Sequence, residues 1–334
     1  MKTGRKISNR GDSALMKCRF SAVLLFSALS LAALCAGKQK PGFQLQANSD
    51  DFWRLVDRES KLSTLASGFG FTEGPVWDRE GFVIVSDEVT NRILRVYMDG
   101  KKEDLVSVGD PDGNTYDRQQ RLIDCASVLR AIIRIDRQGK YEVLANRFEN
   151  MRFNSPNDVV MGPDGAIYFT DPTLDLPVGQ KQEMPFQGVY RLDPSGRVTL
   201  LTKELSQPNG LAFSPNGKRF YVDDSEGRNI RVFDFTSEHT LENGRVFAQE
   251  PGGKGDGVPD GMKIDQTGNI YATGPKGIWV WNPEGRHLGT IVLPEQPANL
   301  AWGDPDYSTL YIAATTSVYR LRTKSHGFVP YLSK

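Results

Sequence analysis

Six side chains with oxygen donors recur at one phase of a repeated pattern in the sequence. They are Glu73, Asp112, Asn157, Asn209, Asp260 and Asn299, and they are separated by 39, 45, 52, 51 and 39 residues. If such groups converged on one axis, the carboxylates would repel one another unless a hard cation lay among them. An all-oxygen ligand set suits Ca²⁺ better than a metal that prefers thiolate or imidazole. The pattern therefore predicts one divalent ion, with Ca²⁺ favoured and Zn²⁺, Mn²⁺ or Mg²⁺ as alternatives.

A simpler interpretation of these residues is that Asn-Gly and Asp-Gly pairs form tight turns. For a single copy we would prefer this interpretation, but recurrence at one phase favours a shared site. Proline also precedes three of the copies, at Pro156, Pro208 and Pro259. Because proline restricts the backbone, the polar residue that follows is expected to be held rigidly.

The elements that must position these side chains are short strands. Each copy is followed by an apolar alternation, a turn of the Asp-x-x-Gly or Asn-Gly kind and a β-rich run. The strand candidates are 83–86, 93–96, 167–170, 188–192, 219–222, 230–233, 270–273, 278–281 and 310–313. Repeats of this length match four-stranded units. We therefore predict an all-β fold, a six-bladed β-propeller of four-stranded blades, rather than a β-sandwich, which would not require the same polar residue in each repeat.

The chain divides into three expected parts. Residues 1–37 contain six basic residues and the apolar run 20–36, and this arrangement is typical of a signal peptide. We expect the protein to be exported, to the periplasm or the medium, with an uncleaved anchor as the alternative. Residues 38–51 are expected to be a linker, and 52–334 the propeller. Within the propeller, 52–71 is expected to supply a strand that completes the last blade and closes the ring.

Charge and cysteine content exclude several classes of function. Removal of residues 1–37 changes the balance from 41 basic and 41 acidic residues to 35 and 40, which argues against a nucleic-acid partner. Cys125 would be the only cysteine left, so no internal disulfide is expected. None of the three histidines lies at the repeated position, and no Gly-x-Ser-x-Gly sequence is present. A histidine-based triad, a histidine-rich zinc site and a serine esterase are therefore disfavoured.

Five stretches of the chain resemble the senescence-marker protein/gluconolactonase family, the regucalcin-like lactonases. They are 71–77, 152–158, 168–172, 207–214 and 259–262. The resemblance implies a propeller with one catalytic divalent ion, whose ligands here would be Glu73, Asn157, Asn209 and Asp260. It also implies lactone hydrolysis, in which the ion polarises the carbonyl and a metal-associated water attacks it. We assign Asp260 as the general base.

Three further residues are expected to contact the substrate. Arg152 and Asn154 precede the third-repeat ligand and are placed at the channel mouth, although a structural salt bridge would equally explain Arg152. Asp112 could bring a third carboxylate to the channel, or form a second ion site with Asp110 and Asn114. Many family members carry Cys-Glu-His where this chain has Cys125-Ala126-Ser127, which puts any histidine contact there in doubt. The connection 171–187 is a candidate partial lid.

The sequence favours a metal-dependent hydrolase that opens a sugar-acid lactone. Two alternatives remain open: a phosphotriesterase or arylesterase at the same site, and a calcium-stabilised binding module without catalysis. The expected partner is a small-molecule lactone or ester. We expect a monomer, with no nucleic acid and no permanent membrane insertion.

Overall fold

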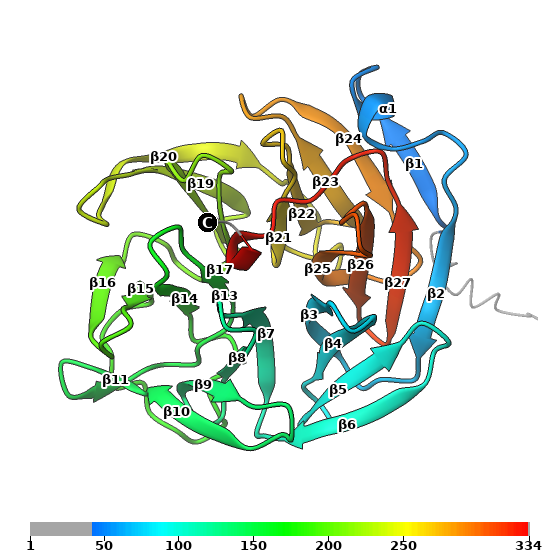
Figure 1. The fold of residues 1–334 in the computed structure, drawn as a ribbon. Coiled ribbons are helices and arrows are strands. Elements are labelled where there is room, and N and C mark those ends of the chain that lie inside the picture. The colour runs from blue at the N-terminus through cyan, green and yellow to red at the C-terminus, as the bar shows by residue number, and fades with distance from the viewer. Residues whose placement is uncertain (1–41, 333–334) are drawn as a thin grey trace, which may run out of the picture. The chain divides into compact units, whose positions relative to one another are not determined.

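The computed structural model describes residues 42–332, which fold into six antiparallel blades arranged as a β-propeller (Figure 1). Blades 1 to 3 consist of β3 (Thr72–Asp78), β4 (Phe82–Asp87), β5 (Arg92–Tyr97) and β6 (Lys102–Ser107); β7 (Pro111–Tyr116), β8 (Leu122–Ala126), β9 (Ala131–Ile135) and β10 (Tyr141–Ala145); and β13 (Val159–Met161), β14 (Ile167–Asp171), β15 (Gly188–Leu192) and β16 (Val198–Thr202). Blades 4 to 6 consist of β17 (Pro208–Phe213), β18 (Arg219–Asp224), β19 (Asn229–Phe235) and β20 (Leu241–Gln249); β21 (Met262–Ile264), β22 (Ile270–Gly274), β23 (Gly277–Trp281) and β24 (His287–Val292); and β25 (Pro297–Gly303), β26 (Thr309–Ala314) and β27 (Ser317–Arg322) with β2 (Leu62–Ser67). The predicted fold class is confirmed.

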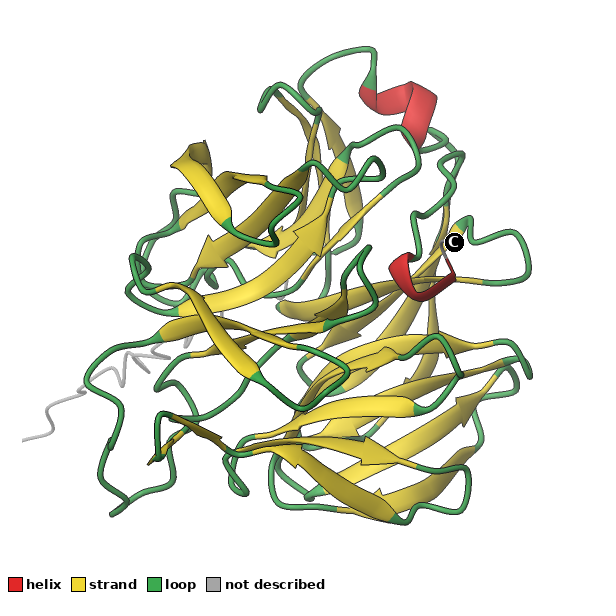
Figure 2. Cartoon of the chain, turned by 60° about the vertical axis from the view of Figure 1, so that its left-hand side comes forward, coloured by secondary structure: helices red, strands yellow, loops and turns green. Residues whose placement is uncertain are grey.

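The remaining elements of the described chain are short. β11 (Arg147–Phe148) and β12 (Met151–Arg152) form a small hairpin between blades 2 and 3. The helices are α1 (Phe52–Leu55) and η1 (Pro330–Leu332), and strands dominate the view in Figure 2. No helix within residues 42–332 has the length and apolar character needed to cross a membrane. The predicted signal peptide, residues 1–37, lies outside the described residues.

The ring is closed by an N-terminal strand, as predicted for residues 52–71. β2 pairs antiparallel with β27, from Leu62 opposite Leu321 to Ser67 opposite Ser317. A second N-terminal strand, β1 (Gln44–Ala47), pairs with β24 and adds a fifth strand to blade 5. This strand falls within 38–51, where we expected a linker. Pairing satisfies the backbone groups on the outer edge of β24, which would otherwise be an exposed sheet edge.

The hydrophobic core lies between neighbouring blades. All six residues of β4 are buried, whereas the outer strand β6 has no fully buried residue. One core cluster joins Ile84 of blade 1, Ile133 of blade 2 and Phe169 of blade 3. Because inner strands pack against a blade on each side, both of their faces are apolar away from the channel. Cys125 is buried in this cluster and forms no disulfide.

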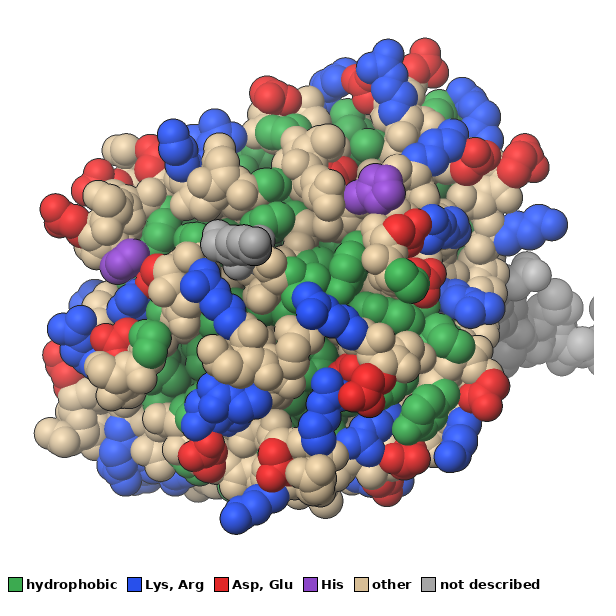
Figure 3. Space-filling view, in the orientation of Figure 1, with side chains coloured by type: hydrophobic (Ala, Val, Ile, Leu, Met, Phe, Trp, Pro, Cys, Tyr) green, Lys and Arg blue, Asp and Glu red, His purple; other side chains and the backbone are tan. Residues whose placement is uncertain are grey.

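The C-terminal segment closes one end of the central channel. Phe328 to Tyr331 line a cavity of about 50 Å³ together with side chains of the innermost strands. The Tyr331 hydroxyl donates a hydrogen bond to the Trp77 carbonyl at 3.2 Å, and its ring packs edge-on against Tyr116. η1 lies over the centre of the ring in Figure 1, and Figure 3 shows that acidic and basic side chains are interspersed on the same face. The C-terminal segment therefore covers this end of the channel.

Candidate active site

The six repeated polar residues lie where the innermost strands begin. Four are within β3, β7, β17 and β25, and the other two precede β13 and β21 by two residues. Five are at most 6 % exposed, namely Glu73, Asp112, Asn157, Asn209 and Asn299, and Asp260 is half-buried. The repeated phase therefore places one polar residue of each blade at the same end of the channel.

The glycines that follow these residues permit close contact between neighbouring blades. The backbone N–H of Gly113 donates to the carbonyl of Asn157 at 2.8 Å, and that of Gly210 donates to Asp260 at 2.8 Å. A Cβ atom at Gly210 would lie 2.0 Å from the Asp260 carbonyl oxygen. Both glycines lie within strands rather than in tight turns, so the turn interpretation is wrong for these two copies. Glycine is required because a side chain would separate the blades.

A cleft of about 450 Å³ opens at this end of the channel. It is lined by Phe71, Glu73, Glu88, Val89, Asp112, Asn157, Leu174, Asp175, Asn209, Ser225, Val258 and Asp260. The predicted ligands Glu73, Asn157, Asn209 and Asp260 all belong to this set, as does Asp112. Five of the lining residues are acidic, and no lysine, arginine or histidine lines the cleft.

Hydrogen bonds leave the amide oxygens of the two asparagines free. The Asn157 Nδ2 donates to Asp112 Oδ2 at 2.7 Å and to Asp175 Oδ2 at 3.3 Å. The Asn209 Nδ2 donates to Ser225 Oγ at 3.2 Å. In both residues the nitrogen is occupied by acceptors, and the carbonyl oxygen accepts no hydrogen bond from a described residue. These oxygens are therefore available to a cation.

Glu73 is held in the same way, by one of its two oxygens. Its Oε2 accepts hydrogen bonds from the Gly74 backbone at 2.6 Å and from Asn299 Nδ2 at 2.9 Å, and Oε1 has no such partner among residues 42–332. Asn299 itself does not line the cleft. Five of the six repeated residues therefore form the cleft, and the sixth supports one of them.

Burial raises the pKa of the carboxyl groups that line the cleft. Burial, with Glu73 and Asp175 as the nearest charges, raises the pKa of Glu88 to about 10. The pKa values of Asp112 and Asp260 lie well above the usual value for the same reason, burial first and neighbouring carboxylates second. Burial also raises the pKa of Asp175. Neighbouring carboxylates disfavour ionisation of Glu88, Asp112 and Asp260, as expected where negative charge is not fully compensated.

The donor set fits a hard divalent cation. A dication among these groups would remove the repulsion that raises their pKa values, and the free amide oxygens would supply neutral ligands. No three histidine, cysteine, aspartate or glutamate side chains within residues 42–332 are grouped so that they could hold a metal by themselves. A site here would therefore depend on the two asparagines as well as on Glu73 and Asp260.

Two predicted substrate contacts lie away from the cleft. Asn154 is fully buried, and its Nδ2 donates to the backbone carbonyls of Asp171 at 3.2 Å and Phe186 at 2.9 Å. The Arg152 guanidinium donates to the Leu129 carbonyl at 3.3 Å. In this arrangement both side chains organise the loops beside blade 3, and their contact with a substrate stays a prediction.

The alternative second ion site, with Asp112, Asp110 and Asn114, stays a prediction. Asp112 faces the cleft, whereas the Nδ2 of Asn114 donates to Ser86 Oγ at 2.7 Å and to the Gly74 carbonyl at 3.0 Å. Asn114 lines the cavity at the closed end of the channel, and Asp110 lines neither space. Asp112 and Asn114 therefore line different spaces.

Glu88 and Asp175 are cleft residues that the sequence did not reveal. Glu88 lies in the turn between β4 and β5, and Asp175 lies in the loop between β14 and β15. Neither occupies the repeated phase. The only signal in the sequence was the prediction that 171–187, which contains Asp175, partly covers the channel, and Leu174 and Asp175 do line the cleft.

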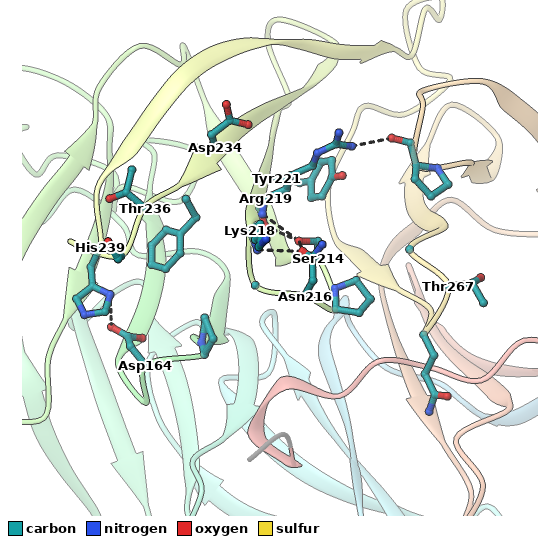
Figure 4. Close-up of a pocket in the computed structure, with 18 residues that line it drawn as sticks. Asp164, Ser214, Asn216, Lys218, Arg219, Tyr221, Asp234, Thr236, His239 and Thr267 are labelled. Carbon is teal, nitrogen blue, oxygen red and sulfur yellow. Dashed lines mark hydrogen bonds and ion pairs between the residues drawn. The ribbon is translucent and has the colours of Figure 1, made fainter.

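A larger hollow, of about 1070 Å³, lies at the opposite ends of the same strands (Figure 4). Its walls include the turns that follow β13, β17 and β21. Two of its polar side chains illustrate the local contacts: His239 Nδ1 lies 3.5 Å from Asp164 Oδ2, and the Arg219 guanidinium donates to the Pro283 carbonyl at 3.0 Å. Burial acts to raise the pKa of Asp164, but hydrogen bonds from Arg191 and Ala166 outweigh it and the pKa is lowered.

Comparison with known proteins identifies a family and several relatives. The SMP-30/gluconolactonase/LRE-like region model matches residues 71–316. A gluconolactonase of Zymomonas mobilis is 34 % identical over 310 residues, covering 82 % of this chain and 84 % of that protein. The pentonolactonase XacC of Haloferax volcanii is 29 % identical and covers 78 % and 83 %.

A solved structure extends the similarity to three dimensions. The structure of a gluconolactonase from Xanthomonas campestris superposes with a TM-score of 0.78 at 31 % identity, covering 84 % of this chain and 94 % of that one. The family model covers more than half of the chain, and the repeated polar residues lie within its limits. The chain therefore belongs to the SMP-30/gluconolactonase family.

Proposed function

We propose that this protein is a metal-dependent lactonase that hydrolyses an uncharged sugar-acid lactone in the cleft. The similarity to a gluconolactonase and a pentonolactonase supports the reaction class. The observation that carries the proposal is the convergence of Glu73, Asn157, Asn209 and Asp260 on one cleft without a cation. Their free oxygens are suited to hold one divalent ion, for which Ca²⁺ is our first choice.

A bound divalent ion would supply Lewis-acid polarisation of the lactone carbonyl and stabilise the negative charge that develops on its oxygen. The protein supplies the proton transfers. Asp260 accepts a proton from the attacking water as its oxygen bonds to the carbonyl carbon. When the ring C–O bond breaks, the same proton passes to the leaving alkoxide, which gives the open hydroxy acid.

The fixed amides orient the reacting groups. Asn157 is held by Asp112 and Asp175, so its carbonyl oxygen keeps one direction relative to the cleft. Asn209 is held by Ser225, whose hydroxyl donates to the Pro259 carbonyl at 2.7 Å. Positions fixed in this way need little rearrangement when a substrate binds, which lowers the cost of reaching the reacting geometry.

The charge and polarity of the cleft favour an uncharged substrate. Its five acidic residues, when ionised, carry more negative charge than one divalent ion offsets, so they would repel a phosphate or carboxylate group on the lactone. Phe71, Val89, Leu174 and Val258 provide apolar surface on which the C–H groups of a sugar ring can pack. The product is a carboxylate, so the same repulsion assists its release.

Hydrolysis of glucono-1,5-lactone by the purified protein with added Ca²⁺ tests this proposal. Acid release is followed against the uncatalysed reaction, and an aryl ester and a phosphotriester are tested in parallel. Saturable turnover of the lactone above the other two esters supports the assignment. Preferential turnover of either of the other esters would contradict it, and no turnover of any would favour a binding module.

We also propose that the protein is exported. The basic residues and the apolar run within 1–37 support this proposal. Cell fractionation and N-terminal sequencing test it: we expect the mature chain outside the cytoplasm with a new N-terminus near residue 38. A full-length protein recovered from the cytoplasm would contradict export.

A further inference from the structure

A lysine lies inside the channel beside the supporting residue of the sixth blade. Lys263 belongs to β21, and it lines the small cavity at the closed end of the channel rather than the cleft. Its Nζ donates a hydrogen bond to Asn299 Oδ1 at 3.1 Å. The innermost strands β21, β25 and β3 are neighbours around the channel (Figure 1), so this contact joins blade 5 to blade 6.

The side-chain amide of Asn299 bridges Lys263 and Glu73. Its Oδ1 also accepts the Leu300 backbone N–H at 2.9 Å, so two donors face the oxygen. With the oxygen fixed, the Nδ2 must face the other way, and it donates to Glu73 Oε2 at 2.9 Å. A flipped amide would place its NH₂ group against the ammonium and its oxygen against a carboxylate, which is unfavourable at both ends.

The charge of Lys263 also acts on this group of residues. Lys263 opposes the rise in the pKa of Glu73 and of Asp158, both of which are buried beside it. Lys263 does not line the cleft. It therefore compensates the negative charge of Glu73 from the closed end of the channel, without occupying space that a substrate or ion would use. A cation in the cleft itself would compete with a bound metal.

We propose that Lys263 and Asn299 are positioning residues that orient Glu73, so that Oε1 remains available to a divalent ion in the cleft. This inference rests on the proposed function, because it assigns a support to one ligand of the proposed ion. It also explains why Asn299, the residue at the repeated position of blade 6, does not line the cleft. Its amide oxygen is occupied by Lys263 and its amide nitrogen by Glu73. Residues that orient ligands in this way commonly change metal affinity by about 10–100-fold.

Calorimetric titration of the purified protein with Ca²⁺ alone tests the inference. We expect Lys263→Met and Asn299→Ala each to lower Ca²⁺ affinity by about 10–100-fold. The double variant should lose no more than the weaker-binding single variant, since both residues act through one chain of contacts. Lys263→Arg should recover most of the affinity, and Lys218→Met, an exposed lysine at the other end of the strands, should bind as the wild type does.

Activity provides a second readout. At limiting Ca²⁺ the Lys263→Met variant should hydrolyse the lactone slowly, and saturating Ca²⁺ should restore its turnover, a pattern that general damage to the fold would not produce. Circular dichroism checks folding, and Lys263→Gln replaces Lys263→Met if the latter does not fold.

Three outcomes would overturn the inference. Wild-type Ca²⁺ affinity in the Lys263 variant, or fully multiplicative losses in the double variant, would show that the two residues do not act together on Glu73; if the wild type still binds Ca²⁺ and hydrolyses the lactone, the proposed function stands. A wild-type protein that neither binds Ca²⁺ nor hydrolyses the lactone would overturn both.

Discussion

The two hollows at opposite ends of the innermost strands differ in volume and in the charges of the side chains that line them, and the difference in charge matters more for function. The larger one, about 1070 Å³, is lined by side chains of both charges, the acidic Asp164 and Asp234 and the basic Lys218 and Arg219. The smaller cleft, about 450 Å³, contains five acidic side chains and no basic one. Uncompensated charge is costly to bury, so a protein that retains it in one place is expected to use it there.

Two aspartates, one from each hollow, have pKa values that are shifted in opposite directions. Asp164 forms an ion pair with Arg191 at 2.7 Å, and its pKa is lowered although it is partly buried. Asp260 has neighbouring carboxylates instead, and its pKa is raised well above the usual value. The same side chain therefore behaves oppositely because of its neighbours, and only the second arrangement calls for an external cation.

Replacement of each of these two aspartates by asparagine should give the largest difference in effect between the two ends of the strands. Asp260→Asn removes the proposed base and one charge from the ligand set, so we expect kcat to fall by about 10²–10⁴-fold with the fold retained. Asp164→Asn, the matched control, should cost up to about 3 kcal/mol of unfolding free energy because it leaves Arg191 with only its longer ion pair to Asp193, at 3.9 Å, with activity retained below the unfolding temperature. Steady-state kinetics and thermal unfolding measure the two effects. Equal activity of Asp260→Asn and wild type would refute the role of Asp260.

The kcat/KM of a lactone should depend on its charge, because the cleft, unlike the larger hollow, is lined by acidic side chains and by no basic ones. The 6-phosphorylated form of glucono-1,5-lactone should have a kcat/KM at least about tenfold below that of the uncharged lactone, since the acidic residues repel it. Val89→Lys, at an exposed position on the cleft wall, should narrow this ratio, and Val178→Lys, an exposed valine that does not line the cleft, should not. A phosphorylated lactone that reacts as fast as the uncharged one would contradict the charge argument.

The stability of the metal-free protein should depend on pH in the direction set by the raised pKa values. Glu88 has a pKa of about 10 in the folded chain and an ordinary value of 4.5, so its protonated form stabilises the fold. That contribution is complete below about pH 4.5 and is lost as the pH rises toward 10. With a chelator present, we expect the unfolding midpoint to fall between about pH 6 and about pH 8.5, and Ca²⁺ to raise it more at the higher pH. A larger effect of Ca²⁺ at the lower pH would count against uncompensated carboxylates as its binding site.

Glu88→Gln should have the smallest effect. The change removes one carboxyl group that has no side-chain hydrogen-bond partner among residues 42–332, so the metal-free protein should unfold about 2–4 °C higher at about pH 8.5, equivalent to about 1 kcal/mol. At about pH 6 the variant and the wild type should differ less. An equal shift at both pH values would indicate a change in packing instead of relief of charge.

Much of this architecture could be predicted from the sequence because the repeat carries it. Strand alternation and the recurring polar residue placed Glu73, Asn157, Asn209 and Asp260 at one end of a six-bladed ring, and the structure brings them together. The closing strand from residues 52–71 was likewise expected because a ring must hide its edges. In contrast, β1 pairs with a strand more than 240 residues away, and the polar/apolar alternation of its four residues is too short to indicate that partner.

Other features depend on contacts that no repeat encodes. Glu88 and Asp175 reach the cleft from loops, so their position follows from the folded chain alone. Asn299 shares its phase with the cleft residues, yet Lys263 occupies its oxygen and gives it a different role. Arg152 and Asn154 adjoin a predicted ligand in sequence, but their side chains bond to neighbouring loops. The position of a residue in the sequence therefore determines the blade or loop to which it belongs, and side-chain packing determines the direction in which its side chain points.

The central claim is that the uncompensated oxygens of the cleft hold a divalent ion on which lactone hydrolysis depends. Its most direct test is to measure glucono-1,5-lactone hydrolysis by the purified protein after exhaustive chelation, and again during titration with Ca²⁺, Mn²⁺, Mg²⁺ or Zn²⁺. We predict that chelation reduces turnover to the uncatalysed rate and that one of these ions restores it in the wild type but not in Asp260→Asn. Undiminished hydrolysis by the metal-free protein would contradict the claim.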